Sequence, residues 1–116
     1  MNKRHLSTLE YPKILHTLST HTSFSAGKEK ALTLEPTDDQ TEIKGRLDTT
    51  TEARTLLEER PGTSVGGAHD VRPLTDDAKR GQVLPSTDLL DVRDTLTAGR
   101  RLQRTLGRME NLYPHL

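Results

Sequence analysis

The sequence predicts an all-α fold, and three observations support that prediction. Apolar residues, mostly leucine, recur at steps of three and four from Ser86 to about Met109, which is the spacing of one face of a helix. Turn-forming residues cluster between such segments, most clearly in Pro61–Gly67. No stretch shows the alternation of apolar and polar residues that is typical of a half-buried strand. We therefore expect a helical bundle fragment of about five helices.

The segment from Ser86 to about Met109 is predicted to be the longest helix, with about six turns. Ser86 or Thr87 is expected to cap its first turn. Leu96 lies near the middle of the apolar stripe, so we expect it to be buried, whereas Arg104 lies on the other side and should be exposed. The stripe consists of Leu89, Val92, Leu96, Gly99, Leu102 and Leu106, with Met109 at its edge.

Shorter helical elements are expected before the long helix, each between turn or capping signals. In chain order they are a short helical turn around Leu6, a helix from Tyr11-Pro12, one capped by Ser23 or Ser25, one capped by Thr37 or Asp38, and one from Val71 to Arg80. Gly81 is the expected stop of the last of these. The tail from Glu110 can start another helix, which Pro114 would limit.

The composition predicts a thin core. The chain has 116 residues, of which 30% are hydrophobic and 3% aromatic, whereas globular domains average about 45–50% apolar when Gly is counted. We therefore expect residues 1–116 to be one helical segment of a larger domain, which completes its core with other parts of a parent chain or by self-association.

The charge balance and the lack of targeting signals limit the class of protein. The formal net charge is zero, so no overall attraction to nucleic acid is expected. There is no cysteine, and the first residues lack the apolar run of a signal peptide. No segment reaches the length of a membrane span. We expect a cytoplasmic protein with no membrane contact.

No motif for catalysis, cofactor binding or metal binding is convincing. Gly27-Lys28 resembles the end of a phosphate-binding loop, but Thr22 and Glu29 occupy the places of the required glycine and hydroxyl residue. His16 and His21 are five residues apart, rather than the four that place two ligands on one helix face. We expect this chain to contain no catalytic residue, no cofactor-binding residue and no metal ligand.

The basic side of the long helix is the remaining candidate site. Its members are Arg93, Arg100, Arg104 and Arg108. Arginines in such a stripe can contact nucleic-acid phosphates without reading sequence. The stripe has no interleaved aromatic residue, so it offers no platform for base stacking. A solvated helix surface is the alternative interpretation.

Several stretches together resemble the N-terminal end of a known family, the second MutS paralogue, here called MutS-two. Each stretch is a weak motif alone, but their order and spacing also agree, over nearly all of the chain. They are Leu9-Glu10-Tyr11-Pro12-Lys13-Ile14-Leu15, Ser25-Ala26-Gly27-Lys28-Glu29, Thr50-Thr51-Glu52-Ala53 with Leu56-Leu57, Gly66-Gly67-Ala68-His69-Asp70-Val71, and Ala78-Lys79-Arg80-Gly81-Gln82-Val83-Leu84. Ala68 stands where a larger aliphatic residue is common in the family.

The resemblance implies a non-catalytic part of a much longer protein. In the family, an ATPase site that uses ATP and Mg and a C-terminal small MutS-related nuclease domain lie further along the chain, and no family catalytic residue maps onto this sequence. This segment would belong to the helical core and lever region that couples the ATPase to the substrate-embracing clamp. The parent would be a homodimeric ATPase and endonuclease for DNA repair, which binds branched DNA and suppresses recombination, or a ribosome-rescue factor. The alternative is a stand-alone helical nucleic-acid-binding module that uses the arginine stripe.

Overall fold

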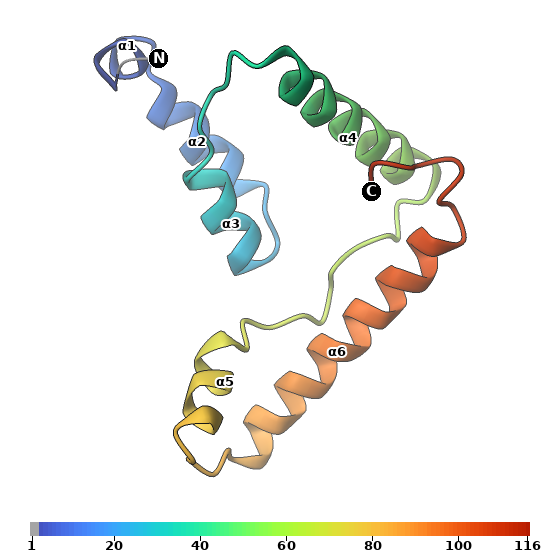
Figure 1. Ribbon diagram of the computed structural model, residues 1–116. Helices are drawn as coiled ribbons and strands as arrows, with labels where there is room; N and C mark the ends of the chain where they lie inside the picture. Colours follow the sequence, from blue (N-terminus) through green and yellow to red (C-terminus); the bar gives the residue numbers. More distant parts are fainter. Residues whose placement is uncertain (1–2) are drawn as a thin grey trace.

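The computed structural model describes residues 3–116, and every regular element in that range is a helix (Figure 1). The all-α prediction is therefore confirmed. The helix count is six rather than about five, because the short turn expected around Leu6 is a helix of its own. The helices are α1 (Lys3–Thr8), α2 (Tyr11–Thr20), α3 (Ser25–Leu32), α4 (Gln40–Glu59), α5 (Arg72–Lys79) and α6 (Ser86–Gly107).

The helix ends differ by one or two residues from the sequence prediction. Asp39, not Thr37 or Asp38, caps α4, and its carboxylate accepts hydrogen bonds from the backbone N–H groups of Thr41 (2.8 Å) and Glu42 (3.0 Å). The predicted cap of α6 at Ser86 or Thr87 is wrong, since Pro85 occupies the capping position without a side-chain hydrogen bond. Helix α6 ends at Gly107 and is followed by turns, so the tail forms no further helix.

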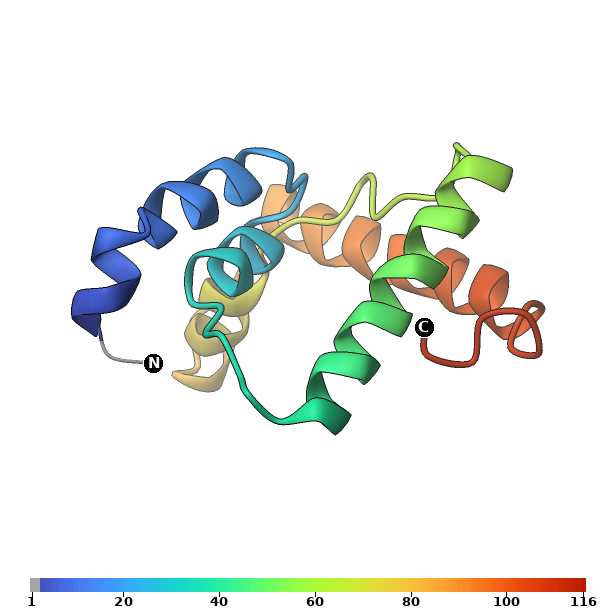
Figure 2. The ribbon, with the colours of Figure 1, turned by 90° about the horizontal axis from the view of Figure 1, so that it is seen from above.

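The helices are spread out rather than gathered around one core. Helix α2 packs beside α3 and contacts α1, while α4 and α6 are long arms with the C-terminal tail between their ends (Figures 1 and 2). The radius of gyration is 17.6 Å, against about 13 Å for a compact domain of similar length. The accessible surface is 9381 Å², against about 6,300 Å² for a compact monomer of this mass.

The largest buried cluster joins α4 to the C-terminal tail. Leu56, Met109 and Tyr113 are 4–7% exposed, and Leu106 packs against them. The hydroxyl of Tyr113 donates to Glu59 Oε2 at 2.5 Å, and this hydrogen bond raises the pKa of Tyr113. The C-terminal tail therefore packs against one face of the C-terminal half of α4.

The prediction that Leu96 is buried is wrong. Leu96 is 59% exposed, whereas Ala98, two residues away and about 160° around the helix, is 4% exposed. The loop that precedes α5 covers the Ala98 side: the His69 N–H donates to Thr95 Oγ1 at 2.9 Å, and Arg101 donates to the Gly66 carbonyl at 2.8 Å. The apolar stripe therefore turns partly outward, with Leu89 and Leu96 exposed and Met109 buried.

Candidate interaction surfaces

The C-terminal half of α6 is strongly basic. Between Thr95 and Met109 the chain contains four arginines and no acidic residue. Positive side chains near a helix C-terminus are favoured by the helix dipole, which explains locally why this half tolerates them. All four arginines line one hollow of about 420 Å³, together with Thr97 and Thr105. They are Arg100, Arg101, Arg104 and Arg108.

The structure brings three of the four predicted stripe residues together. Arg100, Arg104 and Arg108 line that shared hollow. Arg93 lies about two turns earlier and forms an ion pair with Asp94, at 2.7 Å between Nη2 and Oδ1. Arg101 was missed by the sequence analysis because it does not follow the spacing of four. The lack of acidic residues between Thr95 and Met109 was the signal that could have included Arg101 in the basic surface.

The positive charge of this hollow is not neutralised within the part of the chain that the structure describes. Arg100, Arg104 and Arg108 are exposed and form no ion pair among residues 3–116, and no carboxylate lines the hollow. Closely spaced like charges without counterions attract anions. The hollow therefore has the charge that attracts phosphate groups.

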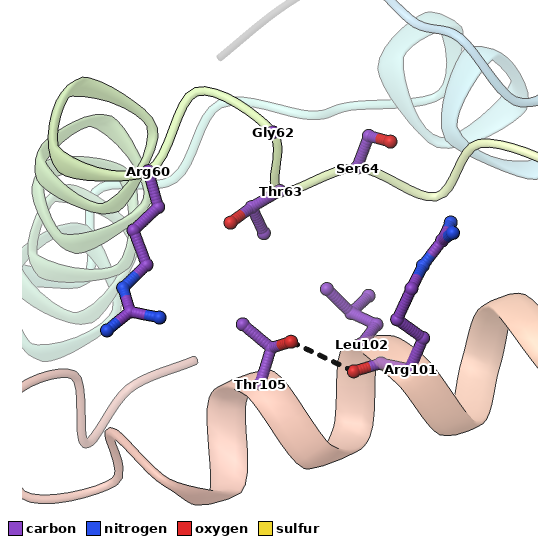
Figure 3. Close-up of a pocket in the computed structure, with 7 residues that line it drawn as sticks. All are labelled: Arg60, Gly62, Thr63, Ser64, Arg101, Leu102 and Thr105. Carbon is purple, nitrogen blue, oxygen red and sulfur yellow. Dashed lines mark hydrogen bonds between the residues drawn. The ribbon is translucent and has the colours of Figure 1, made fainter.

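A second hollow of about 320 Å³ lies between the end of α4, the following loop and α6. Figure 3 shows the side chains of Arg60 and Arg101 on opposite sides of it, with Thr63 and Thr105 directed toward each other across it. Gly62, Ser64 and Leu102 complete the lining. Arg101 and Thr105 line both hollows, so the two form one continuous basic surface.

Three helices carry apolar faces that the described residues cover only in part. On α4 and α6 the side chains of Ile43, Leu47, Leu57, Leu89 and Leu96 are 37–61% exposed. On α2, Ile14 and Leu18 line an open apolar hollow of about 430 Å³ with Lys13, Thr17 and His21. Exposed apolar side chains at helical spacing are typical of surfaces that dock on another element.

Exposed ion pairs tie the spread helices together. Arg72 contacts Glu29 of α3 and Asp70, each at 2.7 Å, and its guanidinium holds the pKa of Asp70 well below its usual range. In the tail, the ring of His115 contacts Glu52 Oε1 at 2.5 Å, and this contact raises the pKa of His115. Burial raises the pKa of Glu52, but its hydrogen bonds to His115 outweigh that effect and lower it.

The described residues present no centre for metal chemistry. Within residues 3–116, no group of three or more His, Asp or Glu side chains is placed to hold a metal ion. None of the helices described is both long and apolar enough to cross a membrane. Gly27-Lys28 lies inside α3, so it does not form the loop that a phosphate-binding motif requires.

These features define a class: a helical segment with partly exposed apolar faces, one helix with a basic C-terminal half, and a core too small to bury most of its leucines. The sequence is 43% identical to Endonuclease MutS2 of Symbiobacterium thermophilum over 112 residues. It is 37% identical to Endonuclease MutS2 of Pelotomaculum thermopropionicum over 116 residues and 36% identical to that of Thermomicrobium roseum over 114 residues. These matches cover 96–100% of this chain and 14–15% of each relative.

The chain is therefore similar to one segment of MutS2 proteins, and the resemblance identified from its motifs is confirmed. It spans about one seventh of the length of the relatives that it matches. No family profile matches the chain. No solved structure matches it either.

Proposed function

We propose that this chain is a non-catalytic helical part of the core and lever region of a MutS2-type protein, and that its uncovered apolar faces dock on other helices of the same parent. The supporting observation is the exposure of large apolar side chains at helical spacing on both long helices, α4 and α6. A chain that completed its own core would bury most of them.

The free energy available from docking is substantial. Burying a whole leucine side chain contributes about 2 kcal/mol, so a half-exposed one contributes about 1 kcal/mol when covered. Ile43, Leu47, Leu57, Leu89 and Leu96 together therefore offer about 5 kcal/mol. That is comparable with the whole stability of a small domain.

The two long helices suit a mechanical role. Helix α4 has 20 residues and α6 has 22, so each spans about 30 Å. Rigid helices of that length can pass motion between an ATPase and the regions that embrace the substrate. In this proposal ATP and Mg are bound elsewhere in the parent, which acts as a homodimer on branched DNA to suppress recombination, or on ribosomes.

The proposal assigns ATP hydrolysis and DNA cleavage to other parts of the parent. We expect the isolated chain to show neither activity, because the sequence offers no phosphate loop and no metal-ligand cluster. Metal-dependent turnover by the purified chain that a single substitution within it abolished would contradict this assignment.

In the absence of the rest of the parent, copies of the isolated chain should associate with one another through these exposed apolar faces. We expect sedimentation to show oligomers that grow with concentration, or an apolar dye to bind the exposed faces. A strictly monomeric chain at high concentration that binds no dye would argue against the docking proposal.

The alternative function is a nucleic-acid-binding module that uses the arginine stripe, and Arg100, Arg104 and Arg108, which form no ion pair within residues 3–116, favour it. Three phosphate contacts would give a slope of about −2.7 when the logarithm of duplex affinity is plotted against that of salt concentration. Replacing all three with glutamine should abolish this dependence. Affinity that is unaffected by the triple substitution would exclude the stripe as the contact.

A further inference from the structure

The hollow between α4 and α6 has the features of a phosphate site. We propose that it binds a phosphate-bearing anion, with Arg60 and Arg101 on opposite sides of the binding site (Figure 3). Neither residue belongs to the predicted stripe, and the hollow does not depend on the uncovered leucines. The inference therefore stands or falls separately from the docking proposal.

The charges around the hollow favour an anion. Its two charged lining residues are Arg60 and Arg101, and no carboxylate lines it. Arg101 donates one hydrogen bond to the Gly66 carbonyl at 2.8 Å, which orients the guanidinium while other N–H groups stay available. The planar fork of arginine matches two oxygens of a phosphate, which a lysine ammonium cannot do.

Hydroxyl groups supply further donors. Ser64 Oγ accepts a hydrogen bond from the Gly66 N–H at 3.2 Å, so its own proton remains available to donate. The side chain of Thr63 points into the hollow (Figure 3). Thr105, by contrast, already donates to the Arg101 carbonyl at 3.0 Å. An acceptor-only ligand such as a phosphate satisfies the remaining donors.

The dimensions favour a phosphate that belongs to a longer molecule. The volume of about 320 Å³ equals that of roughly ten water molecules, which exceeds what one phosphate group fills. The hollow continues into the arginine-lined one through Arg101 and Thr105. The phosphate can therefore come from a nucleic-acid backbone or from a free phosphate compound, and the chemistry of the site is the same for both.

The test is a titration of the ¹⁵N-labelled chain with pyrophosphate at constant ionic strength, followed by NMR. We expect saturable shifts of the Gly62, Thr63 and Ser64 amides. Arg60→Gln with Arg101→Gln should weaken binding by at least about tenfold, because two charge-assisted contacts are lost. The matched control, Arg54→Gln with Arg80→Gln, removes the same charge outside the hollow and should bind as the unchanged chain does.

Equal losses of affinity in the two double variants would overturn the proposal, as would identical amide shifts when sodium chloride replaces pyrophosphate. If the Arg60 and Arg101 variant loses its helical circular dichroism signal, Thr63→Val with Ser64→Ala takes its place. We expect that variant to bind several-fold more weakly, and unchanged affinity would overturn the proposal equally.

A second titration identifies the source of the phosphate. A 12-nucleotide single strand that binds more tightly than pyrophosphate, and that loses affinity in the Arg60 and Arg101 variant, supports the site with a nucleic-acid ligand. Displacement of that strand by equimolar pyrophosphate supports the site with a free phosphate ligand. Two results together would overturn the proposal. The strand would shift only amides near Arg100, Arg104 and Arg108 and lose affinity only when those arginines are replaced, and pyrophosphate would not shift the amides of residues 62–64.

Discussion

Truncation of Leu56 is the perturbation whose effect on stability the structure defines best. Leu56 is 4% exposed and lies in the cluster that holds the C-terminal tail on α4. Leu→Ala at buried sites costs about 2–5 kcal/mol through lost transfer free energy and the cavity left behind. Because this cluster is small and lies near solvent, it can partly collapse, so we expect about 2 kcal/mol. The measurement is urea unfolding followed by circular dichroism, in which the midpoint should fall by roughly 1 M.

The neighbouring leucine provides the matched control. Leu57 belongs to the same helix and is 50% exposed, so Leu57→Ala should change the free energy of unfolding by about 0.5 kcal/mol or less. The pair compares the same chemical change at buried and exposed positions with the same helix propensity. Equal midpoints for Leu56→Ala and Leu57→Ala would refute the assignment of the α4 face that the tail covers.

Three further predictions concern other parts of the chain. Leu96→Ala and Arg104→Ala should each change the free energy of unfolding of the isolated chain by about 0.5 kcal/mol or less. If urea unfolding shows a clearly larger loss of this free energy for Leu96→Ala, Leu96 is buried after all. Gly45→Ala should stabilise α4 by about 0.5–1 kcal/mol, since nothing lies within 4 Å of the added carbon, and a lower melting temperature would reveal a contact there. Glu52 raises the pKa of His115 and has its own pKa lowered. The tail contact should therefore be complete between about pH 4.5 and 6.5, weakening above the folded pKa of His115 and below that of Glu52. NMR titration checks this, and Glu52→Gln should return the His115 pKa toward its usual value.

Most of the fold could be predicted from the sequence because helices leave local signals. Apolar spacing and turn residues located all of the longer helices, and the short turn around Leu6 proved to be a sixth. The burial of Leu96 could not be predicted in this way. Periodicity shows which face of a helix is apolar. Which face is buried depends on the segment that packs against the helix in the folded chain. Within residues 3–116 the loop at 65–70 covers the Ala98 side of α6 instead.

The candidate surfaces also differ in whether they leave a local signal in the sequence. Arg100, Arg104 and Arg108 follow one helical spacing, so the sequence alone grouped them. Arg60 lies 41 positions before Arg101 in the chain, and the path of the chain from the end of α4 back along α6 brings both to one hollow. A site assembled from separate elements leaves no local pattern, and for that reason sequence reasoning missed it.

The central claim is that the outward leucines of α4 and α6 dock on other helices of a MutS2-type parent. The most direct test inserts this chain in place of the matching segment of the Symbiobacterium thermophilum relative and introduces Leu47→Gln with Leu96→Gln. Both side chains are about 60% exposed here, so at a concentration where the isolated chain is monomeric the double substitution should leave its unfolding midpoint nearly unchanged. In the chimera the account predicts a fall of several degrees in melting temperature, because two buried leucines would be lost. An unchanged melting temperature in a correctly folded chimera would contradict the account.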